Sequence, residues 1–339
     1  MPRKLLFIVA IIPLLMTLSC AKRSTEWQEP DVLELLHQVQ IVGDPLDLDF
    51  DGNQLYVAQD QGGFSIIDLG NYSQKWYSSL VSSDGSTVTF VKIRKVSVVG
   101  VHNRLFLNET DGTDLIRIVD TTNPDSIKVI DAITGATQDI SDMVFEAIPN
   151  PTTADIIRAT YSSGSYVYPG KYDGNLWIGG EPSIHTPSPA SGFAQDDSYI
   201  YVAAQQRGLM IYSKANQQLV GQRAVVGEAL KVAVKGNYAY VVARQGGLHV
   251  LDISNPASPQ LVYTYDTTGY ATSINISGNL AAVSSGGGGI YLFDITSPSQ
   301  PDLLTHLTSC GYTNNAKLHD GKLIVAARDQ GILIYDIAD

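Results

Sequence analysis

The chain has 339 residues, of which 44% are hydrophobic, a length that suits two average domains or one large all-β domain. Its formal net charge of −12 argues against a nucleic-acid partner, because phosphate binding needs a basic surface. The 18 tyrosines and 30 glycines favour many strands joined by tight turns.

The N-terminus has the pattern of a targeting segment. Arg3 and Lys4 precede an apolar run from Leu5 to Leu18, which is shorter than the roughly 20 residues needed to span a bilayer. The sequence "TLSC" that ends at Cys20 resembles the lipobox of bacterial lipoproteins, with Thr17 where that pattern usually has leucine. The resemblance implies a signal peptide at residues 1–19 and a diacylated Cys20. The alternative is an ordinary secretory signal that is cleaved nearby.

Residues 20–31 contain "AKRSTEWQEP", which has no apolar periodicity and is interpreted as a tether. The domain that follows is predicted to occupy residues 32–339. Ala21 after the cysteine resembles the sorting pattern for the outer membrane. We therefore expect the protein at the bacterial outer membrane, held by a lipid anchor on the periplasmic side or the cell surface.

The stretch "DLDFDGNQLYVA" from Asp47 to Ala58 can be read as a calcium loop or as a β-hairpin. A calcium loop of the helix–loop–helix type needs Glu at its twelfth position, where Ala58 stands. Glycine beside Asp or Asn also recurs at the same place in later copies of the stretch, as in "KGNYAYVV" and "SGNLAAV". Glycine there supplies the positive φ of a tight turn, so a hairpin is predicted.

The second half of the chain repeats itself. "GGLHVLDISNPASPQLV" starts at Gly246 and "GGIYLFDITSPSQPDLL" at Gly288, and Asp252, Asp294 and Asp336 follow at intervals of 42 residues (294 − 252 and 336 − 294). A period near 42 without a helical pattern favours a propeller blade. These copies resemble the LVIVD repeat family of bacterial and archaeal extracytoplasmic β-propellers. The resemblance covers roughly residues 195–339 and fades towards the N-terminus.

Weaker copies complete the ring. The counterparts of the repeated aspartate are Asp68, Asp120, Tyr168 and Ser213. Together with the three repeated aspartates, these positions define seven units. The wider spacing between the first units predicts that their hairpins are longer. The fold class is therefore all-β, a seven-bladed propeller of four-stranded blades. The last unit lacks a fourth strand, which the segment from about Leu33 to Val42 should supply, closing the ring. Asp47 and Asp49 then lie on an innermost strand and are expected to face the central channel.

Motifs for catalysis or cofactor binding are weak. The six histidines are scattered over different units without metal-ligand spacing, and the chain contains no G-x-S-x-G. The run "SSGGGGIY" from Ser284 leads into a strand rather than into a helix that would bind phosphate. No metal and no cofactor are predicted.

Polar side chains recur where the second strand of a unit ends. In a four-stranded blade, this turn lies on the same face as the link to the next blade. Arg244 and Arg328 are assigned to equivalent positions, with Ser285 between them in unit six. The predicted ligand-binding residues are Gln59, Asp60, Gln205, Arg207, Arg244, Arg328 and Asp329, with Tyr270 and Tyr312 from the links. The alternative is that the repeat simply copies what its turns require.

Two functions remain open. The first is a non-enzymatic, lipid-anchored binding or scaffold protein whose partner is an envelope protein or an acidic, carboxylate-bearing ligand. The second is a periplasmic or surface hydrolase of the lactonase type with its site in the propeller channel. Its candidate residues are Asp47, Asp49, Glu228 and His319, with Arg244 and Arg328 binding an anion.

Overall fold

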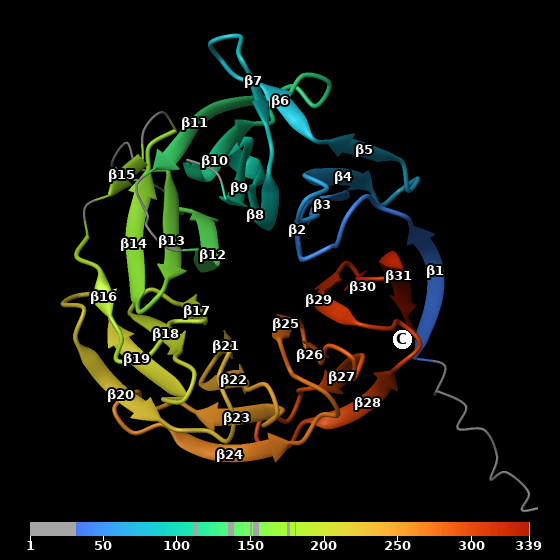
Figure 1. Ribbon diagram of the computed structural model, residues 1–339. Coiled ribbons are helices and arrows are strands. Elements are labelled where there is room, and N and C mark those ends of the chain that lie inside the picture. The colour runs from blue at the N-terminus through green and yellow to red at the C-terminus, as the bar shows by residue number, and fades with distance from the viewer. Residues whose placement is uncertain are drawn as a thin grey trace, which may run out of the picture.

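The computed structural model describes residues 32–338 apart from 112–113, 135–138, 150, 152–155, 175–176 and 180. Seven antiparallel sheets stand around a central channel, as the prediction required (Figure 1). The predicted signal peptide, Cys20 and the tether lie outside the described residues. Within the described ranges, no helix is long and apolar enough to cross a membrane.

Each blade places its first strand at the channel and its last strand at the rim. Blade 1 contains β2 (Asp47–Asp51), β3 (Gln54–Ala58), β4 (Phe64–Asp68) and β5 (Gln74–Tyr77). Blade 2 contains β8 (Lys92–Val99), β9 (Arg104–Thr110), β10 (Asp114–Asp120) and β11 (Lys128–Thr134). Blade 3 contains β12 (Ile140–Ala147), β13 (Ile157–Ser163), β14 (Tyr166–Tyr172), β15 (Trp177–Gly179) and β16 (Ile184–His185). Blade 4 contains β17 (Gly192–Gln195), β18 (Tyr199–Ala203), β19 (Leu209–Ser213) and β20 (Leu219–Arg223).

The last three blades follow the repeat closely. Blade 5 contains β21 (Lys231–Lys235), β22 (Tyr238–Val242), β23 (Leu248–Asp252) and β24 (Gln260–Tyr265). Blade 6 contains β25 (Ser273–Ser277), β26 (Leu280–Ser284), β27 (Ile290–Asp294) and β28 (Asp302–Leu307). Blade 7 contains β29 (Thr313–His319), β30 (Lys322–Ala327), β31 (Gly331–Ile337) and the N-terminal strand β1 (Leu33–Val39).

The pairing of β1 with β31 confirms the predicted closure of the ring. The two strands are antiparallel, with Leu33 opposite Ile337 and Val39 opposite Ile332. Beside this pair, the buried core contains Leu48 and Leu55 from blade 1 together with Ile324 and Ile332 from blade 7. The two ends of the propeller are therefore joined both by a backbone ladder and by apolar packing.

Two features of the first three blades differ from the prediction. The extra length between the first two repeats is an excursion between blades, formed by β6 (Ser79–Val81) and β7 (Thr87–Thr89), and not a longer hairpin within a blade. It projects outward beside β11 (Figure 1). Blade 3 does have the predicted long hairpin, between β12 and β13. Tyr168 lies in the middle of β14 and not at its end, so it is not the counterpart of the repeated aspartate.

The hairpin predicted at Gly52 is present. Asp51 pairs with Gln54 across the turn, and Gly52 has a φ of +54°, a conformation that glycine adopts without steric cost. Gly236 and Gly278 have φ of +55° in the equivalent turns of blades 5 and 6. The stretch that begins at Asp47 is thus a strand and a turn, and not a helix–loop–helix calcium site.

The repeated aspartate stabilises the turn after the third strand. The Oδ1 atom of Asp252 accepts a hydrogen bond from the N–H of Ser254 at 2.8 Å, and Asp294 accepts one from Thr296 at 2.7 Å. Side-chain acceptors of this kind fix turns locally. The Ser254 hydrogen bonds hold the pKa of Asp252 below its usual value. The most regular feature of the repeat is therefore structural.

Candidate functional site

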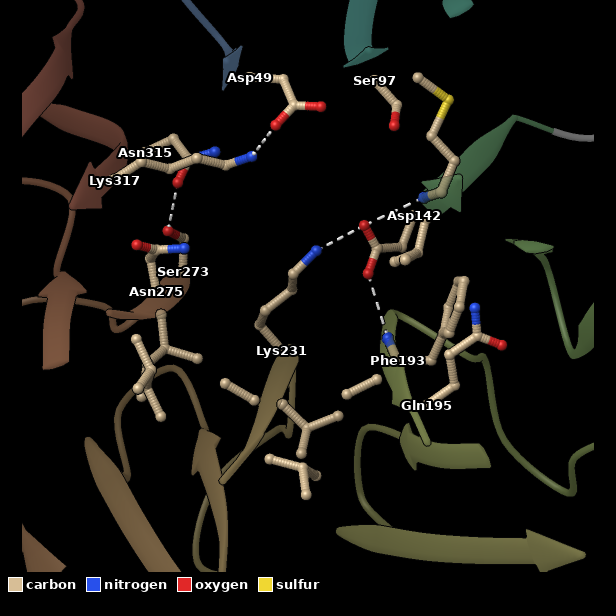
Figure 2. Close-up of a pocket in the computed structure, with 18 of the residues that line it drawn as sticks. Asp49, Ser97, Asp142, Phe193, Gln195, Lys231, Ser273, Asn275, Asn315 and Lys317 are labelled. Carbon is tan, nitrogen blue, oxygen red and sulfur yellow. Dashed lines mark hydrogen bonds and ion pairs between the residues drawn. The ribbon is translucent and has the colours of Figure 1, made fainter. Parts of the chain in front are cut away.

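The central channel holds a cavity of about 670 Å³ lined by the innermost strands and their hairpins. Asp47 and Asp49 line it, which confirms the predicted orientation. Figure 2 shows Lys317 pointing towards Asp49, and Lys231 pointing towards Asp142 on another side of the channel. These pairs bring together residues that lie far apart in the sequence.

The two aspartates of β2 join three blades. Asp49 accepts hydrogen bonds from the backbone N–H of Val98 at 2.8 Å and from Nζ of Lys317 at 3.0 Å. Asp47 accepts one from Val96 N–H at 3.2 Å and one from Nδ2 of Asn315 at 2.7 Å. Blade 1 is therefore tied to blade 2 on one side and to blade 7 on the other.

The same type of contact recurs around the channel. Asp142 of blade 3 accepts hydrogen bonds from the N–H of Phe193 in blade 4, at 3.1 Å, and from Nζ of Lys231 in blade 5. Asn275 of blade 6 accepts a hydrogen bond from Leu318 N–H in blade 7 at 2.9 Å. Side chains of one blade thus satisfy backbone groups of the next, groups that would cost free energy if left unpaired.

Electrostatics reinforces these contacts. Burial alone would lower the pKa of Lys317, but Asp49 and Asp47 outweigh that effect and raise it above its ordinary value. Lys317 is therefore cationic at neutral pH. The lining carries four carboxylates, Asp47, Asp49, Asp142 and Glu146, against three lysines, Lys231, Lys235 and Lys317, so the channel is close to charge balance.

The residues considered for a hydrolase do not converge. Asp47 and Asp49 lie in the channel, but Glu228 pairs with Arg244 at 2.9 Å in a turn. His319 stacks on Phe50, and its Nε2 atom lies 2.8 Å from the carbonyl oxygen of Gly52. Among the described residues, no group of three or more His, Cys, Asp or Glu side chains is placed to hold a metal ion.

The sequence reasoning missed Asp142, Lys231 and Lys317 as channel residues. For Lys317, the sequence signal is a polar residue at every second position of its innermost strand, as in "TNNAKLH" of β29. Alternation places such side chains on one face of the strand. The polar face of β29 could thus be derived from the sequence, whereas its contact with Asp49 of blade 1 could not.

The predicted ligand-binding residues follow the second strands, at the end opposite the hairpin to the first strand, or lie in the links between blades. We call this side of the ring the turn face; it comprises the turns between second and third strands and the links between blades. Gln59 is fully buried there, and its Nε2 atom donates to the carbonyl oxygen of Val42 at 2.8 Å. Gln59 was predicted to bind a ligand, but its side chain is closed to solvent and anchors the link that leads into blade 1. Glu109, which follows the same pattern in blade 2, is also buried and pairs with Arg117.

The other predicted ligand-binding residues are at least partly accessible to solvent. Asp60 and Gln205 have positive φ and join their turns to the next blade through backbone bridges. Arg207 and Asp329 are exposed. The guanidinium carbon of Arg328 lies 4.0 Å from the centroid of the Tyr312 ring. Tyr270 has 59% of its surface exposed.

The turn of blade 6 corrects one detail of the predicted alignment. Arg244 forms a backbone bridge with Ala271, and in blade 6 the bridge to Thr313 is formed by Gly286. Gly286 and not Ser285 is therefore the counterpart of Arg244, while Ser285 is fully buried. The predicted equivalence of Arg328 and Arg244 is supported by the hydrogen bonds of their turns. In blade 7 the N–H of Gln330 donates to the carbonyl oxygen of Ala327, and in blade 5 the N–H of Gly246 donates to that of Ala243, so each arginine is the first residue inside its turn.

Comparison with known families identifies the repeat. The protein-family model described as "LVIVD repeat" matches residues 42–80, 226–267 and 268–308. This propeller contains LVIVD repeats. The matched segments correspond to blades 1, 5 and 6. The first of them lies where we expected the resemblance to fade, so the family's pattern extends to the N-terminal blade.

Solved structures share the fold of this LVIVD-repeat protein at low identity. Raptor of Chaetomium thermophilum has a TM-score of 0.68 at 15% identity over 90% of this chain, which spans 29% of that protein. U3-55K has a TM-score of 0.66 at 12% identity, covering 91% of this chain and 99% of the other. The computationally designed Ika8 protein has a TM-score of 0.57 at 14% identity, covering 90% and 100%. These likenesses concern the fold alone. A comparison with curated proteins gives no match.

Proposed function

We propose that this LVIVD-repeat propeller is a lipid-anchored, extracytoplasmic binding or scaffold protein and not an enzyme. The observation that supports it is the contrast between channel and turn face. The channel carboxylates Asp49 and Asp142 are used in hydrogen bonds between blades, whereas the turn face exposes Tyr270 and Arg244. Exposed aromatic and arginine side chains are the types that dominate recognition of protein partners.

The proposed address rests on the N-terminal sequence that ends in Cys20. We place the protein at the bacterial outer membrane, on the periplasmic side or the cell surface, with an envelope protein as its partner. Mass spectrometry of the mature chain should find a diacylated Cys20 as the first residue. A mature protein that starts at any other residue, without acylation, would contradict the anchor.

The turn face is tested by capture of partners from the cell envelope. In the double variant Arg244→Gln/Arg328→Gln, the captured envelope partners should fall, because both guanidinium groups are at this face. Folding should change by no more than about 0.5 kcal/mol, since both side chains are exposed.

The matched control is Arg223→Gln/Lys128→Gln, which removes the same charge from exposed positions on outer strands. It should keep the partners of the unmodified protein. If the turn-face variant also keeps every partner at the original affinity, the binding surface lies elsewhere on the ring.

A protein partner fits this face better than a free carboxylate ligand. Arg244 already pairs with Glu228 at 2.9 Å, and Arg328 is stacked on Tyr312. An acidic ligand would have to compete with Glu228 for the guanidinium group, since both offer the same bidentate acceptor. A protein surface can instead use the aromatic and charged groups as they stand.

A further inference from the structure

A pairing rule recurs on the turn face. In three blades, a residue in the link that leads to the innermost strand, or at the start of that strand, contacts the turn that follows the second strand of the same blade. The three pairs are Lys92 with Asp111 at 2.5 Å, Glu228 with Arg244 at 2.9 Å, and Tyr312 with the guanidinium of Arg328 at 4.0 Å from the ring centroid. Each pair joins groups of complementary charge or a cation and an aromatic ring.

Blade 6 departs from this rule. Tyr270 holds the same place as Tyr312, because the residue after each of them bridges to the turn of the preceding blade. The turn position that is Arg328 in blade 7 is Gly286 in blade 6. Gly286 has no side chain to place on the ring. Tyr270 is accordingly exposed to 59%, whereas Tyr312 is half-buried.

The glycine itself has a structural reason. A Cβ atom at position 286 would lie 3.2 Å from Cζ of Tyr312, closer than an ordinary contact. Glycine therefore allows Tyr312 to pack on the turn of blade 6. The same choice leaves Tyr270 without a cation from its own blade.

We propose that Tyr270 binds a cationic side chain, guanidinium or ammonium, that a partner protein supplies in place of the arginine of blade 7. This proposal rests on the turn face being the binding face. A cation over a tyrosine ring is attracted by the negative face of the aromatic system. The stacking of the Arg328 guanidinium on the Tyr312 ring shows the same type of contact within this molecule.

The surrounding charge is compatible with a basic partner. The guanidinium of Arg244, whose backbone is bridged to Ala271 beside Tyr270, is neutralised by Glu228 at 2.9 Å. The whole chain has a formal net charge of −12, and a negative net charge attracts a positively charged partner surface.

The test uses full-length protein with ¹³C-labelled tyrosine and small probes of defined chemistry. The Tyr270 ring resonance is assigned by its loss in Tyr270→Leu. N-acetyl-arginine amide should shift this resonance saturably, and N-acetyl-citrulline amide, which is similar in shape but uncharged, should bind at least about threefold more weakly. Equal effects of the two probes, or a stronger effect of N-acetyl-glutamate amide, would overturn the proposal.

Two variants exchange the features of blades 6 and 7. Gly286→Arg is made together with Tyr312→Ala, because a Cβ atom at position 286 would otherwise lie 3.2 Å from the Tyr312 ring. This variant should cover Tyr270 and abolish the arginine-dependent shift; arginine adopts a positive φ at the equivalent position of blade 5, as Arg244 with φ of +32° shows. Arg328→Gly should uncover Tyr312 and create a second arginine-responsive ring. A Tyr312 ring that stays unresponsive in Arg328→Gly would count against the pairing rule. Because these titrations need no envelope partner, they can fail while the capture experiment succeeds, and the reverse.

Discussion

A chain that begins at residue 43 is expected to melt roughly 10 °C or more below a chain that begins at residue 32. The two differ only by the segment that contains β1. Its removal exposes the edge of β31 and opens the ring between blades 7 and 1. The chain that begins at residue 32 keeps every described residue and serves as the matched control.

The size of this effect follows from what β1 contributes. The ladder with β31 runs from Leu33 to Val39, and each of its backbone hydrogen bonds stabilises by about 0.5–1.5 kcal/mol. Val39 is buried against Ile332 and Ile334, and burying a side chain of this size contributes about 1.5–3 kcal/mol. Several kcal/mol is a large part of the 5–15 kcal/mol that typically stabilises a domain.

The measurement is thermal unfolding of both chains, combined with size-exclusion chromatography. The exposed β31 edge should also promote association, because an unpaired strand edge is a template for another strand. Equal melting temperatures and equal elution volumes of the two chains would contradict the role assigned to β1.

Local features of this fold could be predicted because their causes are local. The turn at Gly52 follows from a positive φ that the sequence encodes by glycine beside Asp and Asn. The channel-facing orientation of Asp47 and Asp49 follows from strand alternation once the innermost strand is assigned. Ring closure by β1 could be derived by counting strands in the last repeat.

Contacts between blades could not be predicted in the same way. Lys231 and Asp142 are 89 positions apart, and Asn315 and Asp47 are 268 apart. Strand alternation determines which side chains of an innermost strand face the channel, but not which side chain of which blade they meet. Gln59 shows the converse, because a polar residue in a turn is buried where it satisfies the carbonyl group of Val42.

To define the candidate site on the turn face, both the sequence repeat and the backbone contacts of the structure were needed. Sequence alignment alone assigned Arg244 and Arg328 to the same position, which the turn hydrogen bonds support. It placed Ser285 between them, although the bridges give that place to Gly286. The one-residue difference arises because the run of four glycines offers several equivalent alignments. Only the backbone bridges show which glycine takes the place of Arg244.

Asp142→Ala is expected to lower the free energy of unfolding by roughly 2–4 kcal/mol. The carboxylate has only 3% of its side chain exposed and accepts hydrogen bonds from Phe193 N–H and Lys231. Without it, the backbone group of blade 4 is left unsatisfied and Lys231 loses its counter-charge. Lys231 is 29% exposed to the channel, so water reduces the loss below that of a fully buried pair.

The comparison variant is Asp49→Ala, which removes the same type of contact elsewhere in the channel. Asp49 also accepts a lysine and a backbone N–H of the next blade, but 25% of its side chain is exposed. Its replacement should cost about half as much, since exposed ion pairs are screened by water. Equal losses in urea unfolding for Asp49→Ala and Asp142→Ala would contradict burial as the deciding factor.

A double replacement separates the charge from the hydrogen bond. Asn in the variant Asp142→Asn/Lys231→Met still offers an oxygen to Phe193 N–H and leaves no unpaired lysine in the channel. Removing both partners of a buried pair is often nearly neutral, whereas removing one is costly. The double variant should therefore be more stable than Asp142→Asn alone, by about 1 kcal/mol or more. If Lys231→Met brings no recovery, the stabilisation comes from the hydrogen bond to blade 4, and Lys231 lies in the channel for another reason than to neutralise Asp142.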